Sequence, residues 1–162
     1  MHVKLAMVLA GTVFGLGAAS GAYAADDVSV ERGAHIAIIG GCNDCHTVGY
    51  NESNGKVDPA AALKGSSVGY QGPWGTSYPK NLRLTATQHG GEDGFVDYLK
   101  SFQTLPPMPW YNVHALEEND MRSLYRYIVS LGAPGDPVPD ALPPGTTPKT
   151  PYIVFAPPVM PK

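Results

Sequence analysis

The sequence is poor in charged residues and in cysteine. Asp, Glu, Lys and Arg make up 15% of the 162 residues, well below the roughly 25% of an average soluble protein. Two cysteines exclude a scaffold of several disulfides. The formal net charge is −3 and no basic block is present, which excludes a typical nucleic-acid-binding domain. Glycine and proline are abundant, with 19 and 16 residues, so much of the chain must be turn and extended loop.

The first 24 residues have the pattern of a secretory signal. Lys4 precedes an uncharged run from Leu5 to Ala19, and Ala22-Tyr23-Ala24 places small residues around a larger one before the chain turns polar. The alternative is a membrane anchor, but the run is shorter than the roughly 20 apolar residues of a spanning helix, and glycines interrupt it. We therefore expect residues 1–24 to be a signal peptide that is cleaved after Ala24 during export.

Hydrophobic periodicity predicts three helices. Apolar residues recur at helical spacing over 28–39, 92–102 and 117–131, and glycines follow the first and the last of these segments. Residues 47–91 show no sustained period and are expected to form an ordered loop. Three prolines prevent residues 105–112 from being helical throughout.

The last part of the chain is dominated by proline. Ten of the sixteen prolines lie in residues 134–162, which excludes a helix or a central strand there. The segment Tyr152-Ile153-Val154-Phe155 is too apolar for a disordered terminus. We expect an extended strap on a domain of residues 25–133, with this segment as its anchor. Three short helices give that domain a thin core, so another group is expected to fill its middle.

Cys42-x-x-Cys45-His46 is the motif that attaches a c-type haem. Two thiols about one helical turn apart can add to the two haem vinyl groups, and the next residue can bind the iron. The alternatives are a disulfide, a dithiol redox site and a zinc site. A dithiol site is expected in a βαβ context, and zinc needs further ligands at suitable spacing. We therefore predict one covalent haem c with its iron, and His46 as an axial ligand.

The second axial ligand is predicted to be Met108. It lies in Leu105–Trp110, a loop that prolines make stiff, directly before the last predicted helix. A stiff loop can hold a weak thioether ligand on iron. Met121 lies on the apolar face of its helix and is expected in the core, and Met160 is near the end of the tail. His114 is the rival ligand and would lower the reduction potential.

Four stretches of the chain resemble the class I c-type cytochromes of bacteria, most closely small cytochromes and cytochrome domains that serve periplasmic dehydrogenases. They are Gly41–Thr47, Gly72–Thr76 with Asn81-Leu82, Pro106–Trp110 and Tyr125–Leu131, and the tail with Pro151-Tyr152-Ile153 is also of that type. The resemblance implies an all-α, cytochrome c-like fold in which three to four helices surround one covalently bound haem.

The resemblance also implies roles for residues near the haem. Gly33 matches a glycine that lets the first and last helices cross closely, with an aromatic residue such as Tyr125 against it. A proline carbonyl, of Pro59 or Pro73, would accept a hydrogen bond from the ring of His46 and strengthen it as a ligand.

Other positions depart from the family pattern or have two possible roles. Arg83 lies in a divergent loop and is expected to face a haem propionate. Glu117 stands where the family has Ser or Thr, which weakens the N-cap of the last helix. Three aromatic residues are expected either on the haem edge or in the core: Trp74, Tyr78 and Trp110.

The expected function is one-electron transfer in the periplasm, between a dehydrogenase or other donor and a respiratory acceptor. Filled axial positions leave no site for a substrate, so no enzyme activity is expected. One alternative is a haem-based sensor of small ligands, if Met108 can be displaced. Another is an electron-transfer subunit of a dehydrogenase complex, and a single haem motif disfavours a two-haem peroxidase. The partners are expected to be redox proteins and not nucleic acid, with membrane association only through a partner or an uncleaved signal.

Overall fold

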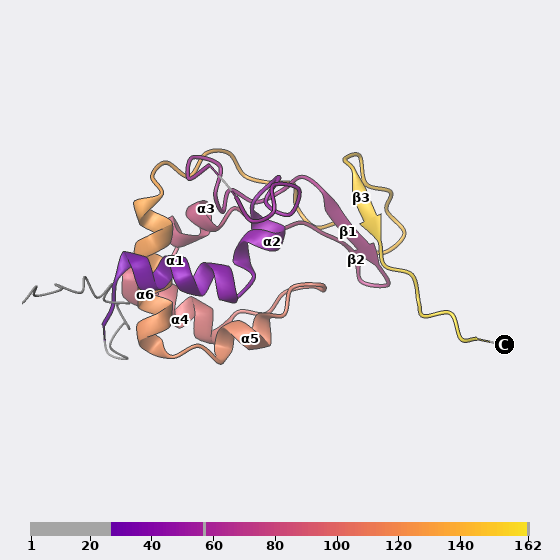
Figure 1. The fold of residues 1–162 in the computed structure, drawn as a ribbon. Coiled ribbons are helices and arrows are strands. Elements are labelled where there is room, and N and C mark those ends of the chain that lie inside the picture. Colours follow the sequence, from indigo (N-terminus) through magenta and orange to yellow (C-terminus); the bar gives the residue numbers. More distant parts are fainter. Residues whose placement is uncertain (1–26, 57, 162) are drawn as a thin grey trace, which may run out of the picture.

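The structure, a computed structural model, describes residues 27–56 and 58–161 (Figure 1). In chain order the elements are α1 (Val30–Ile39), α2 (Cys42–His46), β1 (Gly69–Gly72), β2 (Gly75–Ser77), α3 (Leu82–Thr87), α4 (Glu92–Ser101), α5 (Trp110–His114), α6 (Glu118–Ser130) and β3 (Tyr152–Val154). The predicted signal peptide, residues 1–24, lies outside the described residues. Within the described ranges, no helix has the length and apolar character needed to cross a bilayer.

The three predicted helices are present as α1, α4 and α6. The fold is mainly helical, as expected, but the described chain has six helices and a small sheet in place of three to four helices alone. The sheet has the order β2-β1-β3, with β1 antiparallel to β2 and parallel to β3. The three additional helices have only five or six residues, too few to produce a recognisable period of 3.6.

The centre of the molecule is the crossing of α1 over α6. Gly33 makes this crossing possible, because a Cβ atom there would lie 2.0 Å from the carbonyl oxygen of Ser123 and 2.7 Å from Cβ of Tyr127. The predicted role of Gly33 is confirmed, but the aromatic residue against it is Tyr127. Tyr125 instead packs against Phe95, with ring centroids 5.5 Å apart.

A buried apolar cluster surrounds this crossing. Its members come mainly from α1, α4 and α6, with two from the loop before β1: Ile36, Ala37, Ala62, Leu63, Ala86, Phe95, Val96, Leu99, Met121, Leu124 and Ile128. Cys42 packs against this cluster at the start of α2. The core therefore extends from the helix crossing to the first residue of the haem motif.

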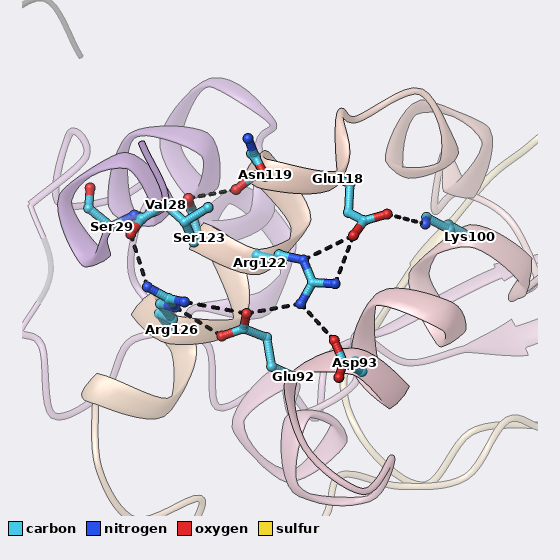
Figure 2. A network of polar contacts seen from close by, with 10 residues as sticks. All are labelled: Val28, Ser29, Glu92, Asp93, Lys100, Glu118, Asn119, Arg122, Ser123 and Arg126. Carbon is cyan, nitrogen blue, oxygen red and sulfur yellow. Dashed lines mark hydrogen bonds and ion pairs between the residues drawn. The ribbon is translucent and has the colours of Figure 1, made fainter. Parts of the chain in front are cut away.

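A network of charged side chains joins α4 to α6 on the surface (Figure 2). Arg122 donates to Asp93 at 2.7 Å, to Glu92 at 3.1 Å and to Glu118 at 2.7 Å. Arg126 bonds Glu92 at 2.9 Å, and it also donates to the carbonyl of Val28 at 3.0 Å, just before α1. The network thus joins α4 and α6 to the segment that leads into α1.

The start of α6 depends on this network. The N-cap residue, Glu117, makes no side-chain capping bond, as its weak capping tendency predicts. Glu118 and Asp120 instead place negative charge in the first turn, where the helix dipole favours it. Lys100 on α4 donates to Glu118 at 2.7 Å, which connects that first turn to the preceding long helix.

The Pro-rich tail is held against the domain mainly by hydrogen bonds to its backbone. The side-chain amide of Asn81 donates to the carbonyls of Pro134 and Asp136, at 2.7 and 3.0 Å. Thr76 and Leu142 exchange backbone hydrogen bonds at 2.9 and 2.8 Å, and β3 then pairs with β1. The predicted anchor pairs in this way, and its residues remain 40–61% exposed.

Replacing Gly33 with alanine should destabilise the protein. The added methyl group would overlap the backbone of α6, so the helices must separate, at a cost of about 2 kcal/mol or more after the roughly 1 kcal/mol gain in helix propensity. Urea unfolding of the Gly33→Ala variant measures this cost. The exposed His35 on the same helix provides the control, and equal stability of Gly33→Ala and His35→Ala would contradict the close crossing.

Acid should weaken the network at Glu118. Hydrogen bonds from Lys100 and Arg122 lower the pKa of Glu118 from 4.5 to about 2. Because the folded-state pKa is depressed, the stabilisation is complete above about pH 4.5 and is lost as the pH falls towards 2. Between pH 5 and 2.5 the urea midpoint of the wild type should therefore fall more steeply than that of Glu118→Gln. Glu52→Gln, at an exposed loop position, should follow the wild type, and parallel curves for all three proteins would refute the prediction.

Candidate functional site

The two cysteines lie on one short helix directly after α1. Gly41 has a φ of +67°, a left-handed conformation that glycine adopts readily and that turns the chain from α1 into α2. Cys42 and Cys45 are half-buried free thiols, about one turn apart on α2. Burial raises the pKa of Cys42 to about 11. A reactive dithiol needs a low thiol pKa, so this environment does not favour a redox-active pair.

His46 is held in one orientation by its ring nitrogen Nδ1. The side chain is 7% exposed, and Nδ1 donates a hydrogen bond of 2.7 Å to the carbonyl oxygen of Lys80. Because Nδ1 carries the proton, the lone pair of Nε2 is available as a metal ligand. Burial also lowers the pKa of His46, which favours the neutral, ligating imidazole.

The acceptor for His46 corrects the sequence-based expectation. Neither Pro59 nor Pro73 provides the carbonyl; it belongs to Lys80, the residue after Pro79. Any residue type can provide a backbone carbonyl, so no side-chain pattern marks this position.

The end of α2 is supported by bonds that the sequence analysis missed. The hydroxyl of Thr47 donates to the side-chain oxygen of Asn43 at 2.7 Å and accepts from the backbone N–H of Leu63 at 2.9 Å. The N–H of Gly65 donates to the carbonyl of His46 at 2.8 Å. These bonds connect the haem motif to the loop before β1 and position the His46 backbone.

The residues of this site fit a covalently attached haem. They provide two unpaired thiols on one helical turn, followed by an imidazole whose Nε2 is free. In the parts of the chain that the structure describes, no group of three or more His, Cys, Asp and Glu side chains could hold a metal ion. Two thiols and an adjacent imidazole are the groups that a c-type haem uses for attachment and for iron ligation.

Two hydrogen bonds restrain the loop that contains Met108. The hydroxyl of Ser77 on β2 donates to the carbonyl of Pro106 at 2.5 Å. The carbonyl of Met108 accepts from the N–H of Trp110 at 2.9 Å, at the start of α5. Figure 1 shows the segment between α4 and α5 extending beyond α5 on the same side of the helical body as α2 and the sheet. The half-buried Met108 thus lies in a restrained loop.

The other candidate axial ligands have different surroundings. Met121 is 1% exposed within the core cluster, which confirms its predicted structural role. Met160 is 80% exposed near the end of the tail. Nε2 of His114 donates to the carbonyl of Phe102 at 2.8 Å, and the His114 ring centroid lies 5.0 Å from that of Trp110. His114 is therefore engaged in holding α5 against the end of α4.

Arg83 has a structural role, which corrects the expectation that it faces a propionate. It is 3% exposed, and its guanidinium donates to the carbonyls of Ala62 and Leu131 at 2.7 and 2.6 Å and to that of Pro59. A cation at the C-terminal end of α6 is also favoured by the helix dipole. Arg83 therefore joins the loop before β1 to the end of the last helix.

Three aromatic residues belong to the β1–β2 hairpin or directly follow it. Trp74 donates from Nε1 to the carbonyl of Tyr70 at 3.3 Å. The buried Tyr78 accepts a hydrogen bond from Thr150 of the tail at 3.1 Å. Burial and a hydrogen bond to Cys45 raise the pKa of Tyr70 to about 12. Tyr70 is thus a neighbour of the motif that the sequence analysis did not identify.

Comparison with known families agrees with this site. The family model for cytochrome c matches residues 30–132, a range that includes Cys42, Cys45 and His46. The chain belongs to the cytochrome c family. It therefore carries a covalently bound haem c with its iron, the cofactor with which this family transfers electrons. Residues 30–132 accordingly have the cytochrome c fold.

Three relatives are cytochrome c subunits of dehydrogenases. Two are the cytochrome c subunits of quinone alcohol dehydrogenases, from Gluconacetobacter polyoxogenes and Komagataeibacter europaeus. Each is 30% identical to this chain over 114 residues, which cover 65% of this chain and 22% of the relative. The third is the cytochrome c subunit of a gluconate 2-dehydrogenase from Pantoea cypripedii. It is 30% identical over 119 residues, which cover 68% of this chain and 25% of the relative. The chain thus spans about a quarter of the length of these relatives. No solved structure gives a significant match.

Proposed function

We propose that this chain is a periplasmic one-electron carrier with His/Met ligation. In this proposal, residues 1–24 direct export, residues 25–133 form the haem domain and residues 134–162 form an extension that packs on it. Cys42 and Cys45 attach the haem, and electrons pass from a dehydrogenase or other donor to a respiratory acceptor. The observation that carries the proposal is the fixed His46 ring, which directly follows the paired thiols and has Nε2 free.

Each residue of the proposed site has a separate task. When bound, the haem supplies an iron that takes up and releases one electron. Two thioether bonds, through Cys42 and Cys45, would keep the cofactor on the chain. The carbonyl of Lys80 keeps the proton of His46 on Nδ1 and so directs Nε2 to the metal. The bond between Ser77 and Pro106 restrains the loop that would present the Met108 thioether.

The relatives support a dehydrogenase as the electron donor. All three are cytochrome c subunits, two of alcohol dehydrogenases and one of a gluconate dehydrogenase. We therefore propose a donor that oxidises an alcohol or a sugar acid. The second candidate function, a subunit within such a dehydrogenase complex, is favoured by the same observation. Both functions use the same haem site and differ in whether the partner stays bound.

The Met108→Ala variant tests the axial ligand. Oxidised wild-type protein should show the weak near-infrared band of a Met–ferric bond, and Met108→Ala should lack it. Met121→Ala should keep the band but lose about 2–5 kcal/mol of stability, because Met121 is buried in the core. If the band survives in Met108→Ala, the assignment is wrong.

Carbon monoxide distinguishes a carrier from a sensor. With both axial positions filled by His46 and Met108, the reduced protein should bind carbon monoxide slowly or negligibly at neutral pH. Met108→Ala should bind it rapidly, since one position is then open. Flash photolysis and stopped-flow absorbance measure both rates. Rapid, stoichiometric binding by the wild type would favour the small-ligand sensor.

A further inference from the structure

The sheet lies at the end of the molecule where the tail leaves the domain (Figure 1), and it carries a group of exposed apolar residues. We call it the sheet patch, and its members are Trp74, Tyr152, Ile153, Val154 and Phe155. The last four are 40%, 51%, 61% and 41% exposed. Clusters of this kind on a protein surface mark places of contact with other molecules.

The patch borders an uncharged groove. A cavity of about 470 Å³ lies between the β1–β2 hairpin and the tail. Its walls include Gly72 and Pro73 of the hairpin, Thr146 and Thr147 of the tail, and Val154 and Phe155. Among the described residues, none that lines the groove is charged. Such a groove can receive an apolar or neutral polar side chain of another protein.

Charge is nearly absent from the whole region. In β1, β2 and residues 141–161, Lys149 is the one residue that carries a formal charge at neutral pH. Several charged side chains of α4 and α6, in contrast, are paired with one another in the surface network. Depletion of charge and enrichment in aromatic residues are typical of the core of a protein–protein interface. A partner that fits this surface presents uncharged, apolar side chains.

Aromatic side chains connect the sheet patch to the haem motif. The ring centroid of Phe155 lies 5.9 Å from that of Tyr70 and 5.8 Å from that of Trp74. The N–H of Phe155 donates to the carbonyl of Gln71 at 2.7 Å, which fixes Phe155 over the hairpin. The Cys45 side chain is near enough to the Tyr70 hydroxyl to raise its pKa. The patch is therefore one side chain away from a proposed haem attachment point.

Part of this surface lies outside the family domain. The match to cytochrome c ends at residue 132, whereas β3 and Phe155 belong to the tail. The tail is fixed in place by the Thr76–Leu142 bonds and by pairing of β3 with β1. It adds an ordered apolar face beside the haem motif, at the cost of exposing large apolar side chains to water.

We propose that the sheet patch is the docking surface for a redox protein that presents an uncharged apolar surface of its own. The inference rests on the proposed carrier function, and it names where the partner binds. Docking there brings the partner to the Cys45 side of the site, with Tyr70 between them. Apolar contact, not charge steering, selects this partner, so association should depend little on salt.

A pair of matched variants tests the proposal in the haem-loaded protein. Val154→Lys places a charge on the sheet patch, and Val129→Lys places the same charge on exposed α6. The probe is a native-host extract supplied with alcohol or gluconate. Stopped-flow absorbance measures the rate at which the extract reduces the cytochrome. In a second assay the extract is passed over a column of immobilised holoprotein, and the dehydrogenase activity that stays on the column is measured as substrate-dependent reduction of a dye. A small redox mediator confirms that each haem site is intact.

We expect Val154→Lys to be reduced about tenfold more slowly than the wild type and to retain little dehydrogenase activity, as the loss of an interface anchor implies. Val129→Lys should stay within about twofold of the wild type. The wild-type rate and retention should also change less than about twofold between about 20 and 500 mM salt.

Several results would overturn the proposal. If the two lysine variants are reduced at equal rates and retain equal dehydrogenase activity on the column, docking occurs elsewhere. The same follows if the wild-type column loses its dehydrogenase activity at high salt. Sedimentation of the wild type as a dimer that Val154→Lys dissociates would make the patch a contact between copies. Binding to phosphatidylcholine vesicles that Val154→Lys abolishes would make it a lipid contact. If the mediator reduces the wild type but no extract does, the carrier function itself has failed, and the docking proposal fails with it.

Discussion

The hydrogen bond from His46 Nδ1 to the carbonyl of Lys80 is the interaction on which the site depends. It joins α2 to a loop that follows it by more than thirty residues and fixes which ring nitrogen is free. Both ends of the bond are themselves held. Thr47 and Gly65 fasten the end of α2, while Asn81, next to Lys80, caps α3 and binds two carbonyls after α6. The ligand orientation is thus set by the packing of the whole domain.

Sequence periodicity was sufficient for the long helices and for the chemical motif. α1, α4 and α6 each have at least ten residues and an apolar face, so their apolar residues recur often enough to reveal the helical period of 3.6 residues. The spacing of Cys42, Cys45 and His46 is a local signal that needs no knowledge of the fold. The close approach at Gly33 was also predictable, through the resemblance to class I cytochromes.

The remaining features depend on contacts between distant parts of the chain. β1 pairs with β3, which lies about eighty residues later, and neither strand shows the alternating pattern of an isolated amphipathic strand. Tyr127 and not Tyr125 faces Gly33 because residues four apart, here Ser123 and Tyr127, share a helix face. Lys80 acts through a backbone carbonyl, and Arg83 bonds carbonyls of the loop before β1 and of the end of α6. None of these partners has a sequence signature.

Electron transfer by this protein depends on Cys42 and Cys45 together holding one haem. Mass spectrometry of the purified protein after acid–acetone extraction, followed by sequencing of the proteolytic peptide with residues 42–46, measures this directly. We expect the polypeptide plus one haem, with both cysteines modified on the same peptide. A mass equal to the bare chain with a Cys42–Cys45 disulfide, or a haem that acid–acetone removes, would contradict the account.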